Sequence, residues 1–421
     1  MRRRFVRSFA LVLAAVLISS ACGGGSESAS EERTTAEPAQ APQSDGAADF
    51  LTEAPELVIG VVLPETGSLS FLYPPESAGV RLGVEDVRAG GGRVEILAGD
   101  SGTDPDIAIE TVNRLLGEGA HAIIGAAASG VSQGIIQTLY EAQIAQCAAS
   151  NTSAAFSTQE NAEFFFRTVT TTRADAPVMA DNIARSGGTN VAILARGDDW
   201  GKSLSEQLTK SLKELSVASE VVVFSQDAVN FQDIAESVGS MGADTVVILA
   251  FAEGAQIVRS LLEAGVPPIA MHGGAGMFDV GLPSIVSPGN PELLDGFTVY
   301  AASGSIAFNE RLSQVVGGNV VFGGQAYDCV IVLALASLAA GSTDGPDILA
   351  EVQNVTRYGT KCFGYGECAA LLAEGVDIDY DGVSGPLDLD QVGDISVGRF
   401  GIAQVRNGAL EVVRVQDIDV P

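Results

Sequence analysis

Basic residues and histidine are scarce in this chain. Lysine and arginine number 23 against 53 aspartate and glutamate residues, which gives a formal net charge of -30. A nucleic-acid-binding surface needs concentrated positive charge, so this balance argues against nucleic acid as a partner. The two histidines, His121 and His272, have no cysteine close by in the sequence. Structural zinc sites need such neighbours, so we expect no metal site, and no motif predicts a cofactor.

Long hydrophobic runs are also missing after the N-terminal region. The most apolar stretch, Ala326 to Ala340, is shorter than the ~20 residues that a membrane-spanning helix needs, and Asp328 interrupts it. We interpret this stretch as a buried core helix.

Catalytic motifs are absent as well. The hydrolase motif G-x-S-x-G would need glycines where Ala127 and Val131 flank Ser129. A P-loop lysine motif is missing too. His121 opens its predicted strand at the end opposite to Ser129, and His272 is expected to line a cleft rather than to act as a base. The sequence therefore predicts a protein that is not an enzyme.

The first 55 residues have the composition of an export signal and a tether. Basic residues precede an apolar run, Ser8 to Ile18, which predicts a secretory signal peptide over residues 1–21. Its end resembles a bacterial lipobox, so we expect Cys22 to be lipidated and to anchor an exported protein at the cell membrane. The alternative is an ordinary cleaved signal with an incidental cysteine, and both the general and the twin-arginine export routes fit. Residues 22–55 are small and polar and are expected to form a disordered tether.

Four further cysteines lie in the exported part of the chain, where disulfides persist. They allow three pairings. Cys362 and Cys368 enclose a short glycine-rich loop, so we expect a disulfide between them. Cys147 and Cys329 are then either a second disulfide or two buried thiols.

The rest of the chain alternates apolar strands with helices in two successive series. The predicted strands cover residues 57–63, 93–98, 121–124 and 144–148, and then residues 190–194, 219–224, 245–250 and 268–271. This alternation predicts parallel sheets with helices on both faces. The expected fold class is α/β, with two Rossmann-like lobes.

The later part of the chain is expected to divide between these lobes. The predicted lobes are residues 56–170 with about 300–385, and residues 171–299 with about 386–421. We expect residues 297–301 to carry the chain back across. Asn407-Gly408, between two β-rich runs, predicts a hairpin that is a separate addition to the parallel core.

Residues 121–152 predict half of a ligand-binding cleft. A loop of small residues, 125–130, leads from a strand into a helix, whose first N–H groups and dipole favour an anion. Ser129 adds a hydroxyl there, and Ser150 and Thr152 add hydroxyls after the next strand. Ligands of open α/β sheets bind at the carboxyl ends of strands, so we expect these three residues to contact a carboxylate or a phosphate.

The second lobe offers a facing wall. Trp200, the only tryptophan, can close over a ligand or pack on its own helix. Glu253 can pair with a ligand ammonium or simply complement a helix dipole. Asp328 either caps the apolar helix or faces the cleft. Hydroxyls on one lobe with an aromatic ring and an acid on the other fit an α-amino acid zwitterion.

In order and spacing, several segments resemble the type I periplasmic binding proteins, especially the leucine/isoleucine/valine-binding proteins of branched-chain amino acid ABC transporters. The segments that carry the resemblance are residues 57–64, 125–129, 150–152, 199–201 and 326–328. It extends over about residues 55–421. It implies two lobes that are joined by three crossovers and close on a ligand.

The resemblance also implies roles for individual residues. Ser129 corresponds to the serine that contacts the ligand carboxylate, and Ser150 and Thr152 to a loop that contacts the same group. Trp200 corresponds to an aromatic residue that packs on the ligand, and Glu253 to the partner of the ammonium group.

The implied function is that of an exported, lipid-anchored receptor that captures an amino acid or a related small molecule for an ABC permease. The family's proline-containing loop is here residues 147–152, in which Asn151 adds polarity and argues against a purely aliphatic ligand. Two alternatives are a receptor of the same fold that reports to a signalling partner, and an exported hydrolase. The lack of a nucleophile–base pair argues against the hydrolase.

Overall fold

The computed structural model describes residues 50–52 and 54–421. The predicted signal peptide, the lipidation of Cys22 and most of the predicted tether lie outside the described residues. The tether prediction was wrong at its C-terminal end. Phe50 and Leu51 pack against the core of the first lobe and Ala54 belongs to it, because these apolar side chains find a surface on which to be buried.

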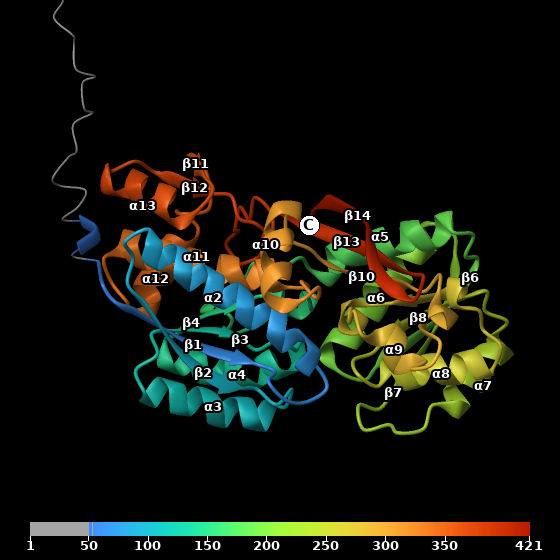
Figure 1. Cartoon of the computed structure of the whole chain (residues 1–421). Coiled ribbons are helices and arrows are strands. Elements are labelled where there is room, and N and C mark those ends of the chain that lie inside the picture. Colours follow the sequence, from blue (N-terminus) through green and yellow to red (C-terminus); the bar gives the residue numbers. More distant parts are fainter. Residues whose placement is uncertain (1–49, 53) are drawn as a thin grey trace, which may run out of the picture. The chain divides into compact units, whose positions relative to one another are not determined.

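The first lobe is built on a five-stranded parallel sheet (Figure 1). In sheet order its strands are β2 (Val94–Asp100), β1 (Leu57–Leu63), β3 (Ala122–Gly125), β4 (Ala145–Ala148) and β5 (Phe165–Arg167). Its helices are α2 (Tyr73–Ala89), α3 (Pro105–Gly117), α4 (Ser129–Ala142), α10 (Ile306–Val316), α11 (Gly323–Ala340), α12 (Gly345–Val352) and α13 (Tyr365–Ala373). A small pair of strands, β11 (Thr360–Cys362) and β12 (Ile378–Tyr380), completes this lobe. Strand β1 is buried along almost its whole length, as expected for an apolar strand covered on both faces.

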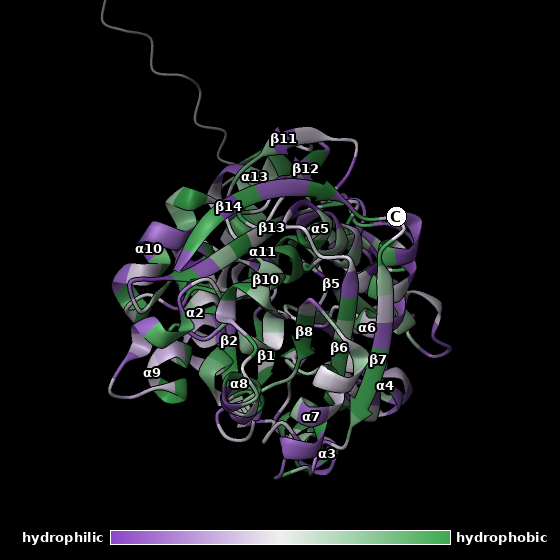
Figure 2. Cartoon of the chain, turned by 90° about the vertical axis from the view of Figure 1, so that its right-hand side faces the viewer, coloured by the Kyte–Doolittle hydropathy of each residue, from purple (hydrophilic) through white to green (hydrophobic). Residues whose placement is uncertain are grey.

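The second lobe is built on a seven-stranded mixed sheet. In sheet order its strands are β14 (Ala409–Asp419), β13 (Val397–Arg406), β10 (Thr298–Ala302), β9 (Met271–Gly273), β8 (Thr245–Leu249), β6 (Asn190–Arg196) and β7 (Ala218–Phe224). Its helices are α5 (Thr172–Arg185), α6 (Asp199–Glu214), α7 (Gln232–Met241), α8 (Gly254–Glu263) and α9 (Leu282–Val286). Figure 2 shows strand β8 as hydrophobic, and every residue of this strand is buried.

The C-terminal hairpin is an extension of the second sheet, and the prediction of a separate addition was wrong. All five residues of β10 pair antiparallel with β13. The residues expected to carry the chain back, 297–301, therefore lie almost entirely in a central strand, and the crossing follows that strand. The hairpin turn itself was predicted correctly. Asn407 and Gly408 both have positive φ values, 50° and 74°, as a type I′ turn requires.

Three connections run between the lobes: from β5 to α5, from β10 to α10, and from β12 to β13. They confirm the predicted α/β fold with two lobes and three crossovers. Helix α11 is the predicted core helix. By length and composition alone it could cross a membrane, but 89% of it is buried inside the protein.

A buried ion pair joins the end of β5, where the first connection begins, to the third connection. Arg167 Nε donates to Asp394 Oδ1 at 2.6 Å, and the two side chains are 0% and 7% exposed. Arg167 Nη1 donates to the carbonyl oxygens of Asn151 and Ser153, both at 2.8 Å. The Ser157 hydroxyl accepts from Arg167 Nη2 at 3.0 Å and donates to Asp394 Oδ2 at 2.6 Å. A guanidinium removed from water needs such a complete set of acceptors.

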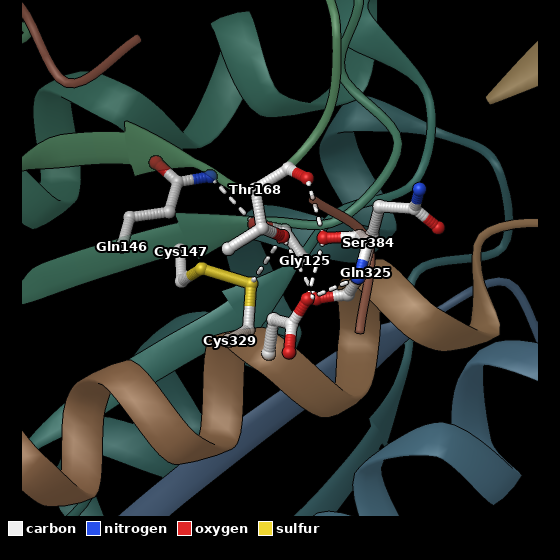
Figure 3. Close-up of a disulfide and its surroundings, with 8 residues drawn as sticks. Gly125, Gln146, Cys147, Thr168, Gln325, Cys329 and Ser384 are labelled. Atoms are coloured by element: carbon white, nitrogen blue, oxygen red, sulfur yellow. Dashed lines mark hydrogen bonds between the residues drawn. A yellow bond between two sulfur atoms is a disulfide. The ribbon is translucent and has the colours of Figure 1, made fainter. Parts of the chain in front are cut away.

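Asp328 of α11 fixes the third connection to the first lobe. Its carboxylate accepts from the Tyr380 hydroxyl at 2.6 Å, and from the backbone N–H groups of Val383 at 3.0 Å and Ser384 at 2.8 Å. The Ser384 hydroxyl also reaches the Thr168 carbonyl oxygen of the first connection, at 3.3 Å (Figure 3). Asp328 neither caps a helix nor faces the cleft, so both expectations for it were wrong.

Two disulfides are present among the described cysteines. Cys362 is bonded to Cys368, the pair that their short loop favoured, and Cys147 is bonded to Cys329, which settles the open alternative. The second disulfide ties β4 to α11 beside the first connection. Thr168 Oγ1 lies 3.5 Å from Cys329 Sγ (Figure 3).

Asp394→Ala is expected to lower the free energy of unfolding by about 3–5 kcal/mol, because it leaves the buried Arg167 guanidinium without its counter-charge. Asp181→Ala is the matched control, since it removes the acid of an exposed pair with Arg185 and should change stability little. Urea unfolding followed by far-UV circular dichroism measures both variants. Equal losses would contradict the structural importance of the buried pair.

Candidate functional site

The first wall of the cleft is the loop between β3 and α4. Gly125 has a φ of 115°, and a Cβ at this position would lie 2.1 Å from the Val62 carbonyl oxygen, so the backbone requires glycine. Helix α4 begins at Ser129, and its N-cap residue, Ala128, makes no side-chain capping hydrogen bond. Val131 and Ser132 donate their N–H groups to the Ala128 carbonyl oxygen, so the N–H groups of Ser129 and Gly130 and the helix dipole are what α4 offers to an anion.

A second loop, after β4, is held against the first loop by side-chain hydrogen bonds. Asn151 Nδ2 donates to the carbonyl oxygens of Ala126 and Ala127, both at 2.8 Å. The Ser150 hydroxyl donates to the Ala127 carbonyl oxygen at 3.2 Å. Asn151 is fully buried behind the loop and does not line the pocket. The prediction that Asn151 adds polarity toward the ligand was therefore wrong.

The second wall is formed by the segments that lead into α6 and α8. Asp198 is the N-cap residue of α6, and its side chain accepts from the Gly201 N–H at 2.8 Å. Trp200 is 5% exposed, and its ring stacks on Phe251 with centroids 5.3 Å apart. Trp200 thus packs within its own lobe and also lines the pocket.

The two walls enclose a small pocket. The first lobe contributes Ser129, Ser150 and Thr152, and the second lobe contributes Trp200 and Phe251. Four of the five predicted ligand-binding residues therefore lie together. The pocket volume is about 20 Å³, which is little more than one water molecule occupies. A solute enters only after the lobes separate or side chains move.

The lobes meet directly beside this pocket. The Ala252 N–H donates to the Ser68 carbonyl oxygen at 3.3 Å, which links the loop after β8 to the loop after β1. On the neighbouring side, the Ala154 N–H of the first lobe donates to the Ser203 hydroxyl of α6 at 3.0 Å. The lobes are therefore closed over the pocket in this arrangement.

Glu253 does not have the position that the sequence suggested. Its Oε1 lies 2.6 Å from Arg196 Nη1, and Arg196 Nε also donates to Asp198 at 2.8 Å. The Arg196 guanidinium carbon lies 4.5 Å from the centre of the Phe251 ring. Glu253 is absent from the pocket wall. Its charge is already paired with Arg196, and its assignment as the ammonium partner stays an untested prediction.

The histidines are both engaged away from the pocket. His272 is 3% exposed, and its Nδ1 lies 2.8 Å from the Tyr300 hydroxyl. Burial lowers the pKa of His272 to about 4. His121 Nδ1 accepts from the Val58 N–H at 3.1 Å. The expectation that His272 lines the cleft was wrong, because the ring faces the core of the second sheet instead.

Sequence reasoning missed several residues of the site. Leu69 and Leu72, in the turn between β1 and α2, and Phe322, just before α11, complete the apolar lining. No local pattern marks Phe322, because only the packing of α11 against α2 brings it to the pocket. Phe251 follows a strand, so the rule of strand ends could have found it.

The fold and the pocket together define a class: a two-lobed α/β binding protein with a ligand pocket between its lobes. The chain belongs to the periplasmic binding protein family, whose model matches residues 56–386.

Individual relatives agree with this assignment. A Leu/Ile/Val-binding protein homolog from Brucella abortus is 29% identical over 175 residues, which cover 39% of this chain and 45% of the relative. The match thus spans less than half of that relative's length. A leucine-binding protein from Thermotoga maritima has the same fold, with a TM-score of 0.72, 21% identity, and coverage of 85% of this chain and 98% of that one. A solute-binding protein from R. palustris, solved with 4-hydroxybenzoate, has a TM-score of 0.71, 16% identity, and coverage of 87% and 98%.

Trp200→Ala is expected to lower the free energy of unfolding by about 3–5 kcal/mol, because the ring is buried against Phe251. Trp200→Phe keeps an aromatic ring in this position and should lose much less. Urea unfolding followed by circular dichroism compares the two variants with the parent chain. A negligible loss in Trp200→Ala would mean that the ring contributes only to ligand contact.

Proposed function

We propose that this chain is an extracytoplasmic receptor that captures a small carboxylate-bearing molecule, an amino acid or a related compound, and delivers it to an ABC permease. One observation carries the proposal. Three hydroxyls and the N-terminus of α4 on one lobe face two aromatic rings on the other across a single pocket. Donors at a helix N-terminus suit a carboxylate, and apolar rings suit the body of the ligand.

The named relatives support this ligand chemistry. Isoleucine is bound in one solved structure of the fold, from Streptococcus pneumoniae, and 4-hydroxybenzoate in another, from R. palustris. Both compounds have a carboxylate on an apolar body. Ser129, Ser150 and Thr152 would contact the carboxylate here, and Trp200 with Phe251 would contact the apolar body.

We also propose that the receptor is anchored at the cell membrane. Removal of residues 1–21 and lipidation of Cys22 would hold the receptor at the outer face of the cell membrane, next to a permease. The sequence pattern supports this placement, and membership of the periplasmic binding protein family supports export.

The proposed mechanism is binding and release without catalysis. A ligand favours the closed arrangement only to the extent that it binds this arrangement better than the open one. Contacts that span both lobes, such as the one between Ser68 and Ala252, then define the state that a permease would recognise. In the part of the chain that the structure describes, Ser129 Oγ accepts from the Ser153 N–H at 3.4 Å and is not bonded to a basic side chain.

Ser129→Ala is expected to weaken carboxylate binding by roughly 10- to 100-fold, since it removes a hydrogen bond to a charged group. A thermal-shift screen of amino acids and aromatic acids identifies the ligand, and isothermal titration calorimetry then measures the affinity. Ser240→Ala, an exposed hydroxyl on α7, is the control and should bind like the parent chain. Unchanged affinity in Ser129→Ala, or turnover of an ester that this variant loses, would contradict the proposal.

A further inference from the structure

Glu76 is a buried carboxyl group that the fold does not use. It lies in the first turn of α2, its exposed fraction is 0%, and neither carboxylate oxygen has a hydrogen-bond partner among the described residues. Buried polar groups in folded proteins are nearly always paired, because an unpaired one loses its hydration without compensation. An isolated buried carboxyl therefore calls for a partner that binds from outside the chain.

Glu76 does not itself line the pocket in this closed arrangement, but it lies next to residues that do. Leu72, four residues earlier and thus on the same face of the helix, lines the pocket. Ser150 also lines the pocket, and its hydroxyl is the neighbouring group that lowers the pKa of Glu76, although burial has the larger effect and raises this pKa to about 8. The Ser150 hydroxyl has a single proton and donates it to the Ala127 carbonyl oxygen at 3.2 Å in this arrangement, so it can donate to Glu76 only by giving up that bond.

Several charged groups on α2 and on the elements packed against it have other partners, and in the described part of the chain none of them is bonded to Glu76. Asp328 of α11 is bonded to Tyr380 and Ser384. Asp86 of α2 itself accepts from Arg311 of α10 and from the Tyr327 hydroxyl of α11. The Glu367 carboxylate of α13 accepts from the Phe363 N–H. Burial and the Ser150 hydroxyl are the causes of the shift at Glu76, and no charged side chain is among them.

From this geometry we infer that Glu76 is the residue that recognises the ammonium group of an amino acid ligand whose carboxylate is held by Ser129 and the start of α4. This inference rests on the proposed function. Ser150 borders both groups, and the ammonium and carboxylate of an α-amino acid are separated by a single carbon atom. The role expected of Glu253 thus falls to Glu76, because Arg196 has already neutralised Glu253.

Binding of an ammonium group next to Glu76 changes the protonation state of its carboxyl group. In the closed arrangement, burial raises the pKa of Glu76 to about 8, which favours the protonated form near neutral pH. An ammonium group stabilises the carboxylate form, so Glu76 releases its proton to solvent as the ligand binds. A plain carboxylic acid anion brings no ammonium and leaves Glu76 protonated. Proton release is therefore a property of amino acid binding alone.

The test compares leucine with 4-methylpentanoate, which is leucine without its amino group. In the parent chain leucine should bind more tightly, and Glu76→Gln should weaken leucine binding by at least about 30-fold while it leaves 4-methylpentanoate nearly unchanged. Glu85→Gln, on the exposed side of the same helix, is the matched control and should behave like the parent chain. Phenylalanine and 3-phenylpropanoate form a second pair of the same design.

Calorimetry in two buffers of different ionisation enthalpy counts the protons without any variant. Leucine should release up to about one proton near neutral pH, and its affinity should rise with pH and level off above about 8. Equal binding of both members of each pair, no proton release, or full leucine affinity in Glu76→Gln would overturn the role of Glu76 and leave the receptor proposal standing. Failure of all four compounds and of every other carboxylate to bind would overturn both.

Discussion

The buried guanidinium of Arg167 is the interaction on which the site depends. Its ion pair with Asp394 ties the first connection between the lobes to the third, and its Nη1 holds the carbonyl oxygens of Asn151 and Ser153. Those two residues belong to the loop that carries Ser150 and Thr152. The same cation thus fixes the crossover region and the ligand loop. Loss of any partner of a buried charge is costly, so the positions of the groups around Arg167 are tightly constrained.

The distribution of charge across the pocket follows from which carboxylates are already paired. On the second lobe Arg196 binds both Asp198 and Glu253, so this wall presents rings and no free charge. On the first lobe Glu76 is buried without a partner. Proximity of an acid to a cleft therefore says little about ligand chemistry. What matters is whether another side chain of the fold has already compensated its charge.

The crossover region is reinforced on the side of the first lobe. The Cys147–Cys329 disulfide and the hydrogen bonds of Asp328 hold α11, β4 and the third connection together. Across the cleft the lobes meet through hydrogen bonds, such as Ser68 with Ala252 and Ala154 with Ser203, and through the apolar residues that line the pocket. The disulfide and the ion pair lie at the connections, whereas the contacts across the cleft are hydrogen bonds and apolar packing. This arrangement favours rigid-body motion of the two lobes about the connections.

The sequence by itself determined the two α/β lobes, the turn at Asn407-Gly408 and the hydroxyl wall around Ser129, because strand periodicity, turn chemistry and helix starts are local properties. Tertiary structure alone decided that the hairpin joins β10, that Phe322 reaches the pocket, and that Glu253 is paired while Glu76 is not. These outcomes depend on segments far apart in the chain. The identity of a side chain's partner is a property of packing in space, which residue type and spacing do not encode.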